Sequence, residues 1–327
     1  MKIPGDTPRH TALIFKWTLW LVFSLLLTGL SVAFATLNHH NLQRQYEAWR
    51  TLDQSRHQQQ LQALLHQLEG DLLTQAHLIP SLSGLRQALQ QGDPGELGRL
   101  FSAHWADFKT DTHLVMAGFL DIHGQFLVQA QLIHTHYDPP AQLWQAVDQA
   151  LLIDTSSTFV DCKWDCLSYA VTPVLAMGQT VGAVTLAQPV TSLLMSFHTL
   201  SGGLDMALFQ VAPQRTGAAL TDAGQLLGMT RRDELEPLLA SAMPAILKSA
   251  TVTHGQLDDG RQMELMPYLL LEDRAGHRVI AVVITDVTQA QRQMKLAQWQ
   301  NMLVGIMGLL LMTLAVRRLT RPLFPRR

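Results

Sequence analysis

The sequence predicts an α+β protein in which a long stalk helix leads into two tandem antiparallel-sheet units, with a transmembrane helix at each end. Two uncharged apolar stretches, Trp17–Ala35 and Trp299–Val316, predict the terminal helices, because a helix needs about 20 such residues to cross a bilayer. Leucines at helical spacing predict the stalk. The order strand pair, helix and three strands occurs twice, and it predicts the two units.

The apolar stretches and their flanks also predict the topology. We assign residues 17–36 and 299–316 to membrane helices, residues 1–16 to a cytoplasmic N-terminus and about residues 37–298 to the exterior. Basic residues lie on the outer flank of each stretch, and short basic flanks remain in the cytoplasm. These residues are Lys2, Arg9, Lys16, Arg317, Arg318, Arg321, Arg326 and Arg327.

One alternative concerns the first stretch alone. Ala33, Phe34 and Ala35 resemble the small-residue site at which a signal peptide is cleaved, although the run is longer than the usual apolar core of about 7–15 residues. Cleavage would leave the C-terminal helix as the only anchor, with the same exterior location for the middle of the chain.

The charge between the membrane stretches excludes one class of partner. This part of the chain holds 16 basic and 25 acidic side chains. Nucleic-acid binding requires a basic face, so we expect no nucleic-acid partner.

The stalk helix is predicted over residues 37–91. Its apolar side chains recur three and four residues apart, which indicates one face of a helix. The same face suggests a parallel contact between the stalks of a homodimer. Its members are Leu61, Leu64, Leu65, Leu68, Leu72 and Leu73.

The first sheet unit is predicted over residues 80–200. Its helical start is interrupted at Gly92–Gly95, where Gly, Asp and Pro indicate a turn and a new helix. Turn residues at 121–124 and 177–178 indicate two hairpins. The expected strands are 114–120, 125–133, 158–161, 167–174 and 180–187, with a helix at 140–152 and another from Pro189.

The second sheet unit is predicted over residues 201–285 in the same order. Its expected strands are 204–211, 217–220, 251–254, 262–271 and 278–285, with a helix at 232–248. A connecting helix over residues 286–298 would join it to the second membrane helix.

Two local strings carry a family resemblance. Gly118–Gly124 (GFLDIHG) contains a D-x-x-G hairpin, and Ala170–Ala183 contains Pro173, Gly178, Val181 and Gly182 at the spacing of a second hairpin. Both strings and the order of elements resemble the double Cache family, whose members are extracellular sensor modules of bacterial receptors with two PAS-like units on one stalk helix. The string Arg317–Leu323 resembles the start of a HAMP linker, so the chain looks truncated before its output domain.

The resemblance implies a function as well as a fold. It implies the input region of a bacterial inner-membrane receptor that senses a periplasmic small molecule and needs no cofactor. Arg317, Arg318, Arg321 and Pro322 would relay the signal to a histidine kinase, a cyclic-di-GMP enzyme or a chemotaxis transducer. The chain itself would not be an enzyme.

The resemblance also suggests a ligand pocket in the membrane-distal unit. Its candidate residues are Trp105, His113, Asp121, Asp154 and Tyr169, because aromatic and charged groups near the sheet could hold an amine or a carboxylate. The alternative is that both aromatic residues are core and the others are surface.

Two further groups of residues carry chemistry. Cys162 and Cys166 are the only cysteines, and a close pair outside the cytoplasm favours a structural disulfide. His134, His136 and Asp138 fit the H-x-H-x-D start of a metal-dependent hydrolase, although Pro139 stands where that family has His. The remaining alternatives are therefore a membrane-anchored metal hydrolase and a ligandless scaffold that binds a periplasmic protein.

Overall fold

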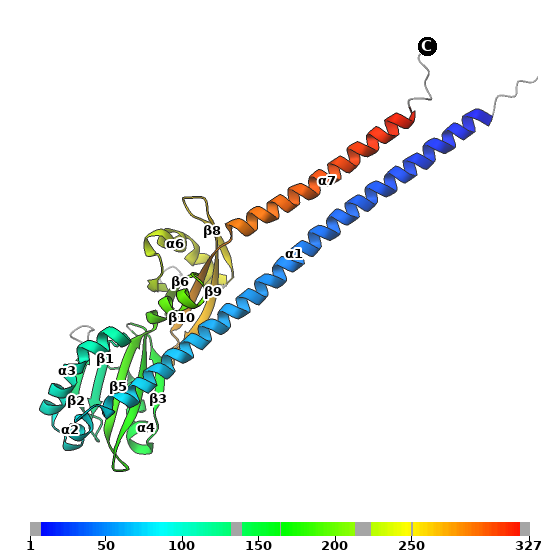
Figure 1. The fold of residues 1–327 in the computed structure, drawn as a ribbon. Coiled ribbons are helices and arrows are strands. Elements are labelled where there is room, and N and C mark those ends of the chain that lie inside the picture. Colours follow the sequence, from blue (N-terminus) through cyan, green and yellow to red (C-terminus); the bar gives the residue numbers. More distant parts are fainter. Residues whose placement is uncertain (1–7, 132–138, 164, 213–223, 250, 321–327) are drawn as a thin grey trace, which may run out of the picture. The chain divides into compact units, whose positions relative to one another are not determined.

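The computed structural model describes residues 8–131, 139–163, 165–212, 224–249 and 251–320 (Figure 1). The chain divides into two compact units. One is a helical unit formed by the chain up to Gln54 and from Val287 onward, and the other is a sheet unit, Ser55–Asp286.

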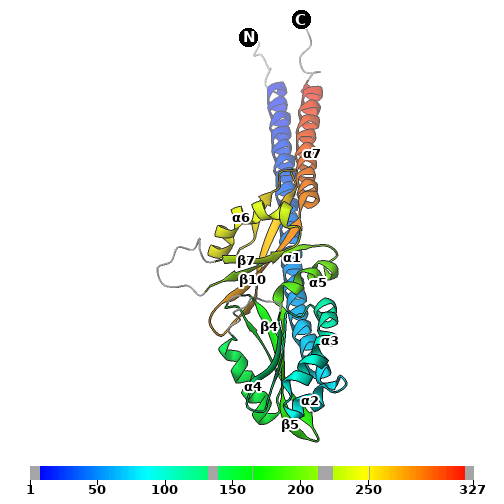
Figure 2. The ribbon, with the colours of Figure 1, turned by 90° about the vertical axis from the view of Figure 1, so that its left-hand side faces the viewer.

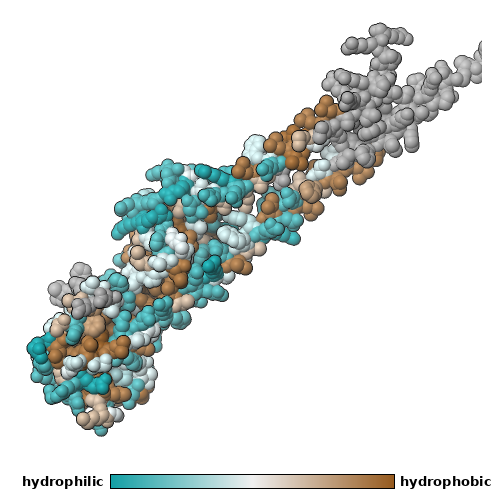
Figure 3. Space-filling model, viewed as in Figure 1, coloured by the Kyte–Doolittle hydropathy of each residue, from teal (hydrophilic) through white to brown (hydrophobic). Residues whose placement is uncertain are grey.

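The helical unit contains the start of α1 (Pro8–Leu78) and α7 (Thr288–Thr320). Large apolar side chains are exposed on both helices, and Figure 3 shows apolar surface there. They include Leu25, Leu26, Leu30, Phe34, Trp299, Leu303, Met307 and Leu310. Among the described residues, no helix combines the length and apolar composition needed to cross a bilayer.

The predicted membrane helices at 17–36 and 299–316 are therefore not confirmed. Part of each stretch lies outside the residues whose side chains are described. The backbone differs from the prediction in one respect, because neither stretch is a separate element. Residues 17–36 continue without a break into the stalk within α1, and residues 299–316 continue the connecting helix within α7.

The sheet unit holds two sheets with the same topology. The first module has β1 (Met116–Leu120), β2 (Phe126–Gln131), β3 (Ser157–Asp161), β4 (Leu167–Ala176) and β5 (Gln179–Pro189), in the order β2-β1-β5-β4-β3. The second module has β6 (Asp205–Val211), β7 (Gly224–Met229), β8 (Thr253–Gln256), β9 (Gln262–Glu272) and β10 (Arg278–Asp286), in the order β7-β6-β10-β9-β8. The two antiparallel-sheet units predicted from the sequence are confirmed.

Helices cover both faces of each sheet (Figure 2). The first module carries η1 (Ile79–Ser81), α2 (Leu85–Gln91) and α3 (Pro94–Thr112) beside the end of α1, with α4 (Ala141–Ile153) on the opposite face. In the second module, α1 packs on one face together with η2 (Val190–Ser192) and α5 (Leu193–Leu200), and α6 (Arg232–Ser249) packs on the other.

The stalk helix ends earlier than predicted, at Leu78 and not at Gln91. Pro80 has no N–H to continue the helical hydrogen bonds, and the chain turns through η1 before Gly84 adopts a φ of 84°. The predicted break at Gly92–Gly95 is present. Gly92 ends α2 with a φ of 63°, and the carboxylate of Asp93 accepts hydrogen bonds from the N–H groups of Gly95 and Glu96 at the start of α3.

The leucine face of the stalk packs against the two modules of the same chain. Leu61, Leu64, Leu68 and Leu72 are buried in the cores of the two modules. These side chains are therefore not available for the predicted contact between two stalks, and such a dimer would have to use other residues.

One predicted strand stays untested. Residues 217–220 lie outside the described residues, and the strand that pairs with β6 is β7, with Gln210 opposite Gln225.

Candidate functional site

The five predicted pocket residues do not form one site. Trp105 on α3 packs against Phe101, with ring centroids 5.5 Å apart, in the core between the first sheet and α1, α2 and α3. Tyr169 on β4 belongs to the opposite face of the same sheet, together with Met116 and Ala187. The sheet separates the two aromatic side chains, so no single ligand could contact both.

The two predicted aspartates are turn residues. Asp121 Oδ1 accepts hydrogen bonds from the backbone N–H groups of His123 (2.9 Å) and Gln125 (2.8 Å), which closes the β1–β2 hairpin. Asp154 follows α4 with a φ of 50° and accepts a hydrogen bond from the Thr180 hydroxyl. The Asp121 carboxylate is explained by its own hairpin turn, and the Asp154 carboxylate by its hydrogen bond with the Thr180 hydroxyl.

His113 also has a local role. It ends α3 in the left-handed region, with a φ of 57°, and its side chain is exposed. Of the five predicted residues, Tyr169 is the one that lies at the site described next.

The site is the part of the first sheet that surrounds Tyr169. The α4 helix packs over Leu120, Val171 and Ala183. The neighbouring cluster contains strand residues and Val115, without a residue of α4. Tyr169 is buried and stacks on Phe159 of β3, with ring centroids 4.9 Å apart and planes 7° apart. Two parallel aromatic rings at this face provide an apolar surface with a polar phenol.

Polar groups lie on the same face. Strand register places Thr185 of β5 opposite both Gly118 and Val171, and Gln129 of β2 opposite Gly118. The Thr185 hydroxyl is fully buried and has no hydrogen-bond partner among the described residues. The Gln129 amide donates a hydrogen bond to Gln131 Oε1 at 3.3 Å and lies 3.6 Å from Met116 Sδ, which is only a weak acceptor.

Gly118 leaves room for the Phe126 ring and the Thr185 methyl group, which pack over it on this face. A Cβ at this position would lie 2.5 Å from the Phe126 ring and 3.0 Å from the Thr185 methyl group. The face carries the Phe159 and Tyr169 rings on β3 and β4, the Thr185 hydroxyl on β5, and the Phe126 ring and Gln129 amide on β2. Such a surface can hold the apolar or cationic part of a small molecule and hydrogen-bond its polar part.

Sequence reasoning missed Phe159, Thr185 and Gln129. Alternation along strands places Tyr169 and Val171 on one face. The hairpin at Met177–Gly178 then pairs Val171 with Thr185. This local signal could have identified Thr185, whereas Phe159 and Gln129 depend on the full strand order.

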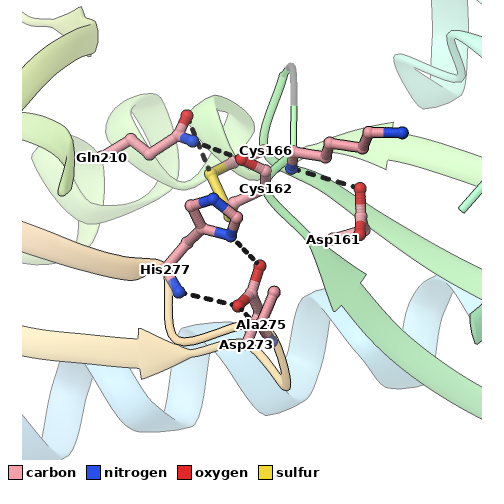
Figure 4. Close-up of a disulfide and its surroundings, with 8 residues drawn as sticks. Asp161, Cys162, Cys166, Gln210, Asp273, Ala275 and His277 are labelled. Carbon is pink, nitrogen blue, oxygen red and sulfur yellow. Dashed lines mark hydrogen bonds and ion pairs between the residues drawn. A yellow bond between two sulfur atoms is a disulfide. The ribbon is translucent and has the colours of Figure 1, made fainter. Parts of the chain in front are cut away.

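The cysteines lie next to this site in the chain. Cys162 and Cys166 form a disulfide with a Cα–Cα separation of 4.1 Å, and both side chains are buried. The preceding Asp161 accepts a hydrogen bond from the backbone N–H of Lys163 (Figure 4). Burial raises the pKa of Asp161, and the negative charge of Asp273 raises it further, against the opposing effects of Lys163 and His277.

The other predicted chemistry is largely untested by the geometry. His134, His136 and Asp138 lie outside the described residues, as do Arg321 and Pro322, while Arg317 and Arg318 lie near the end of α7. Within the described ranges, no three His, Cys, Asp or Glu side chains are grouped to hold a metal ion.

Residues 53–291 match the dCache_3 family model, described as a double sensory domain of two-component sensor kinase. The chain belongs to this double Cache family. Its sensor region therefore includes both modules. No curated protein matches the sequence at a significant level.

Several solved sensor domains are similar over most of this chain at low identity. The periplasmic domain of Vibrio cholerae LuxQ is 14% identical, with a TM-score of 0.47, and the match covers 71% of this chain and 97% of that one. The sensor domain of the V. cholerae histidine kinase DctB is 10% identical, with a TM-score of 0.40 and coverages of 73% and 98%. The ligand-binding domain of the Pseudomonas fluorescens chemoreceptor CtaA with L-serine is 15% identical, with a TM-score of 0.36 and coverages of 72% and 98%.

Proposed function

We propose that this chain is the input region of a transmembrane receptor and that its first module binds a periplasmic small molecule. Membership of a double sensory family supports the sensing role. One observation supports the location of the binding site. The buried Thr185 hydroxyl has no hydrogen-bond partner among the described residues, and it lies on the same face as the stacked Tyr169 and Phe159. A buried hydroxyl without a hydrogen bond costs free energy, and a ligand that supplies the bond would recover it.

The site favours one kind of ligand. Stacked rings suit an apolar or cationic group, and the hydroxyl and amide of Thr185 and Gln129 suit a carboxylate, hydroxyl or amide. Amino acids, small amines and organic acids combine these features. The ligand must prefer one arrangement of the receptor, since equal affinity for two arrangements shifts nothing.

The membrane relay is a further part of the proposal. Exposed apolar side chains on α1 and α7 support anchoring through residues 17–36 and 299–316, and the basic flanks support cytoplasmic ends. The signal would then reach Arg317, Arg318, Arg321 and Pro322, at the start of a HAMP-like linker. The description of the family favours a histidine kinase as the output.

Thermal unfolding of the full chain in detergent, screened against amino acids, amines, organic acids and divalent metals, tests the proposal. A ligand that binds only the folded state stabilises it by about 2.7 kcal/mol at a hundredfold excess over its Kd. We expect one chemical class to raise Tm, and we expect Thr185→Val and Tyr169→Ala to abolish that rise.

Thr253→Val is the matched control, because Thr253 lies on β8 of the second module and should leave the ligand response intact. A rise in Tm with every ligand class would contradict the assigned face if that rise persists in both Thr185→Val and Tyr169→Ala. A rise with zinc alone, lost in His136→Ala, would support the metal-hydrolase alternative. No rise with any compound would favour the protein-binding scaffold.

A further inference from the structure

The loop that follows β3 is closed by the disulfide and reaches into the second module. We call residues 161–166, apart from residue 164, the junction loop. Cys162 and Cys166 are 0% and 3% exposed, and they belong to the same core cluster as Met206, Leu208 and Val283 of the second sheet. The disulfide of the first module is therefore part of the core of the second.

A buried side chain of the second module holds this loop (Figure 4). The Gln210 amide on β6 donates a hydrogen bond to the carbonyl oxygen of Cys162, and its Oε1 lies 3.8 Å from Cys166 Sγ. Gln210 is 8% exposed, so the amide would lose much of its hydration without this contact. On the other side, the Cys166 carbonyl accepts a hydrogen bond from the Val190 N–H at 3.0 Å.

The β9–β10 hairpin lies near the same loop. Its Asp273 accepts hydrogen bonds from the N–H groups of Ala275 and His277 and pairs with the His277 ring, Nδ1 to Oδ2, at 2.8 Å. The charge of Asp273 acts on Asp161 of the junction loop. The adjacent Arg274 donates a hydrogen bond to Gln145 of α4 at 2.9 Å. The hairpin therefore contacts the first module through Arg274, and the charge of Asp273 adds an electrostatic effect on Asp161.

The strand that leads into the loop also contributes to the ligand face. Phe159 of β3 stacks on Tyr169, while the next residue, Val160, packs against the core cluster of the second module. Successive side chains of a strand point to opposite faces, so a displacement of β3 at Phe159 must move Val160 too. Among the described strands, β3 is an edge strand with β4 as its neighbour.

On the side of the second module, Gln210 is linked through β10 to the start of α7, the final helix. Gln210 stands opposite Val279 of β10, and β10 ends at Asp286, two residues before α7 begins. From this geometry we propose that the junction loop couples the ligand face of the first module to β10, with Gln210 as the residue that responds to the loop. The proposal rests on the proposed function, because it assigns a regulatory connection to that ligand face.

Amide hydrogen exchange in the full chain tests the coupling without requiring a ligand. Phe159→Leu perturbs the ligand face, and the exchange rates of β6 and β10 amides are the readout. We expect these rates to change by at least about fivefold, the lower end of typical couplings between sites. Gln210→Met keeps the side-chain length but lacks the amide N–H donor. In this background, the change in exchange rates caused by Phe159→Leu should fall to less than half.

Two further variants complete the experiment. Cys162→Ser with Cys166→Ser opens the loop and leaves Gln210 in place, and it should also weaken the coupling. Gln225→Ala is the matched control, because Gln225 is exposed on β7 directly opposite Gln210, and it should preserve the coupling. Circular dichroism at the exchange temperature verifies that each variant is folded.

An unchanged response of β10 to Phe159→Leu in both junction variants would overturn the proposal, as would the absence of any response in the parent chain. A small molecule that binds the first module in every variant would leave the proposed function intact in either case. A chain that binds no small molecule but shows the coupling would support the junction and contradict the ligand site.

Discussion

The two modules share one strand order but use the corresponding sheet face differently. In the second module, the 18-residue α6 covers a face of apolar side chains, among them Phe209, Leu265 and Val282. In the first module, the 13-residue α4 packs over Leu120, Val171 and Ala183, and the buried Tyr169 and Thr185 lie on the same face. The comparison teaches that sheets with one strand order can carry different chemistry on corresponding faces, and the face with the phenol and the hydroxyl is the one for which we propose a ligand.

Phe209→Ala tests the claim that the second face is a packed core. Phe209 is 5% exposed and packs beneath α6, so we expect a loss of about 3–5 kcal/mol in the free energy of unfolding. Chemical denaturation measures it. A loss below about 1 kcal/mol would mean that this face is loosely packed and would remove the contrast between the modules. Ligand binding by the first module should persist under native conditions.

Gly118→Ala probes the close packing at the centre of the first face. The new methyl group would lie 2.5 Å from the Phe126 ring, and overpacking typically costs about 1–3 kcal/mol. The control is Gly98→Ala on α3, where the nearest atom is the Val128 methyl group at 3.7 Å. That change should stabilise the protein by up to about 1 kcal/mol through helix propensity. Equal effects of the two substitutions on thermal unfolding would show that Gly118 is not sterically required.

Thr185→Val sharpens the distinction between stability and binding. Replacing a buried hydroxyl that has no described partner with a methyl group should stabilise the folded state by about 1 kcal/mol while removing the ligand-dependent rise in Tm. Denaturation with and without the ligand class found in the screen measures both quantities. A destabilised variant with a normal ligand response would assign the hydroxyl to the fold and not to the site.

Asp161→Asn should have the smallest effect on the free energy of unfolding, and this effect should depend on pH. Burial, aided by Asp273, raises the pKa of Asp161 above its ordinary value of 3.8. Protonation therefore favours the folded state, and this contribution is complete below the unfolded-state pKa and lost as pH rises through the folded-state pKa. We expect the variant to be at least as stable as the parent at pH 7 and its relative advantage to shrink on acidification. A difference independent of pH would contradict the raised pKa.

Local chemistry made much of the fold predictable from the sequence. Leucines at helical spacing identified the buried face of the stalk. Asp and Gly residues identified the hairpins at Asp121–Gly124 and Met177–Gly178, because their turns need backbone conformations that these residues favour. The close spacing of Cys162 and Cys166 indicated a disulfide without knowledge of its surroundings.

Only the tertiary structure decided which side chains share a face. Trp105 and Tyr169 look equivalent in sequence, yet the sheet separates them, because their positions depend on strand order and on which helix covers each face. The same is true of the disulfide, which belongs by sequence to the first module but is buried in the core of the second. The sequence by itself determined the elements, their repetition and their turns, since these depend on neighbouring residues. The proposed ligand face and the junction depend on contacts between residues far apart in the chain, which no local pattern encodes.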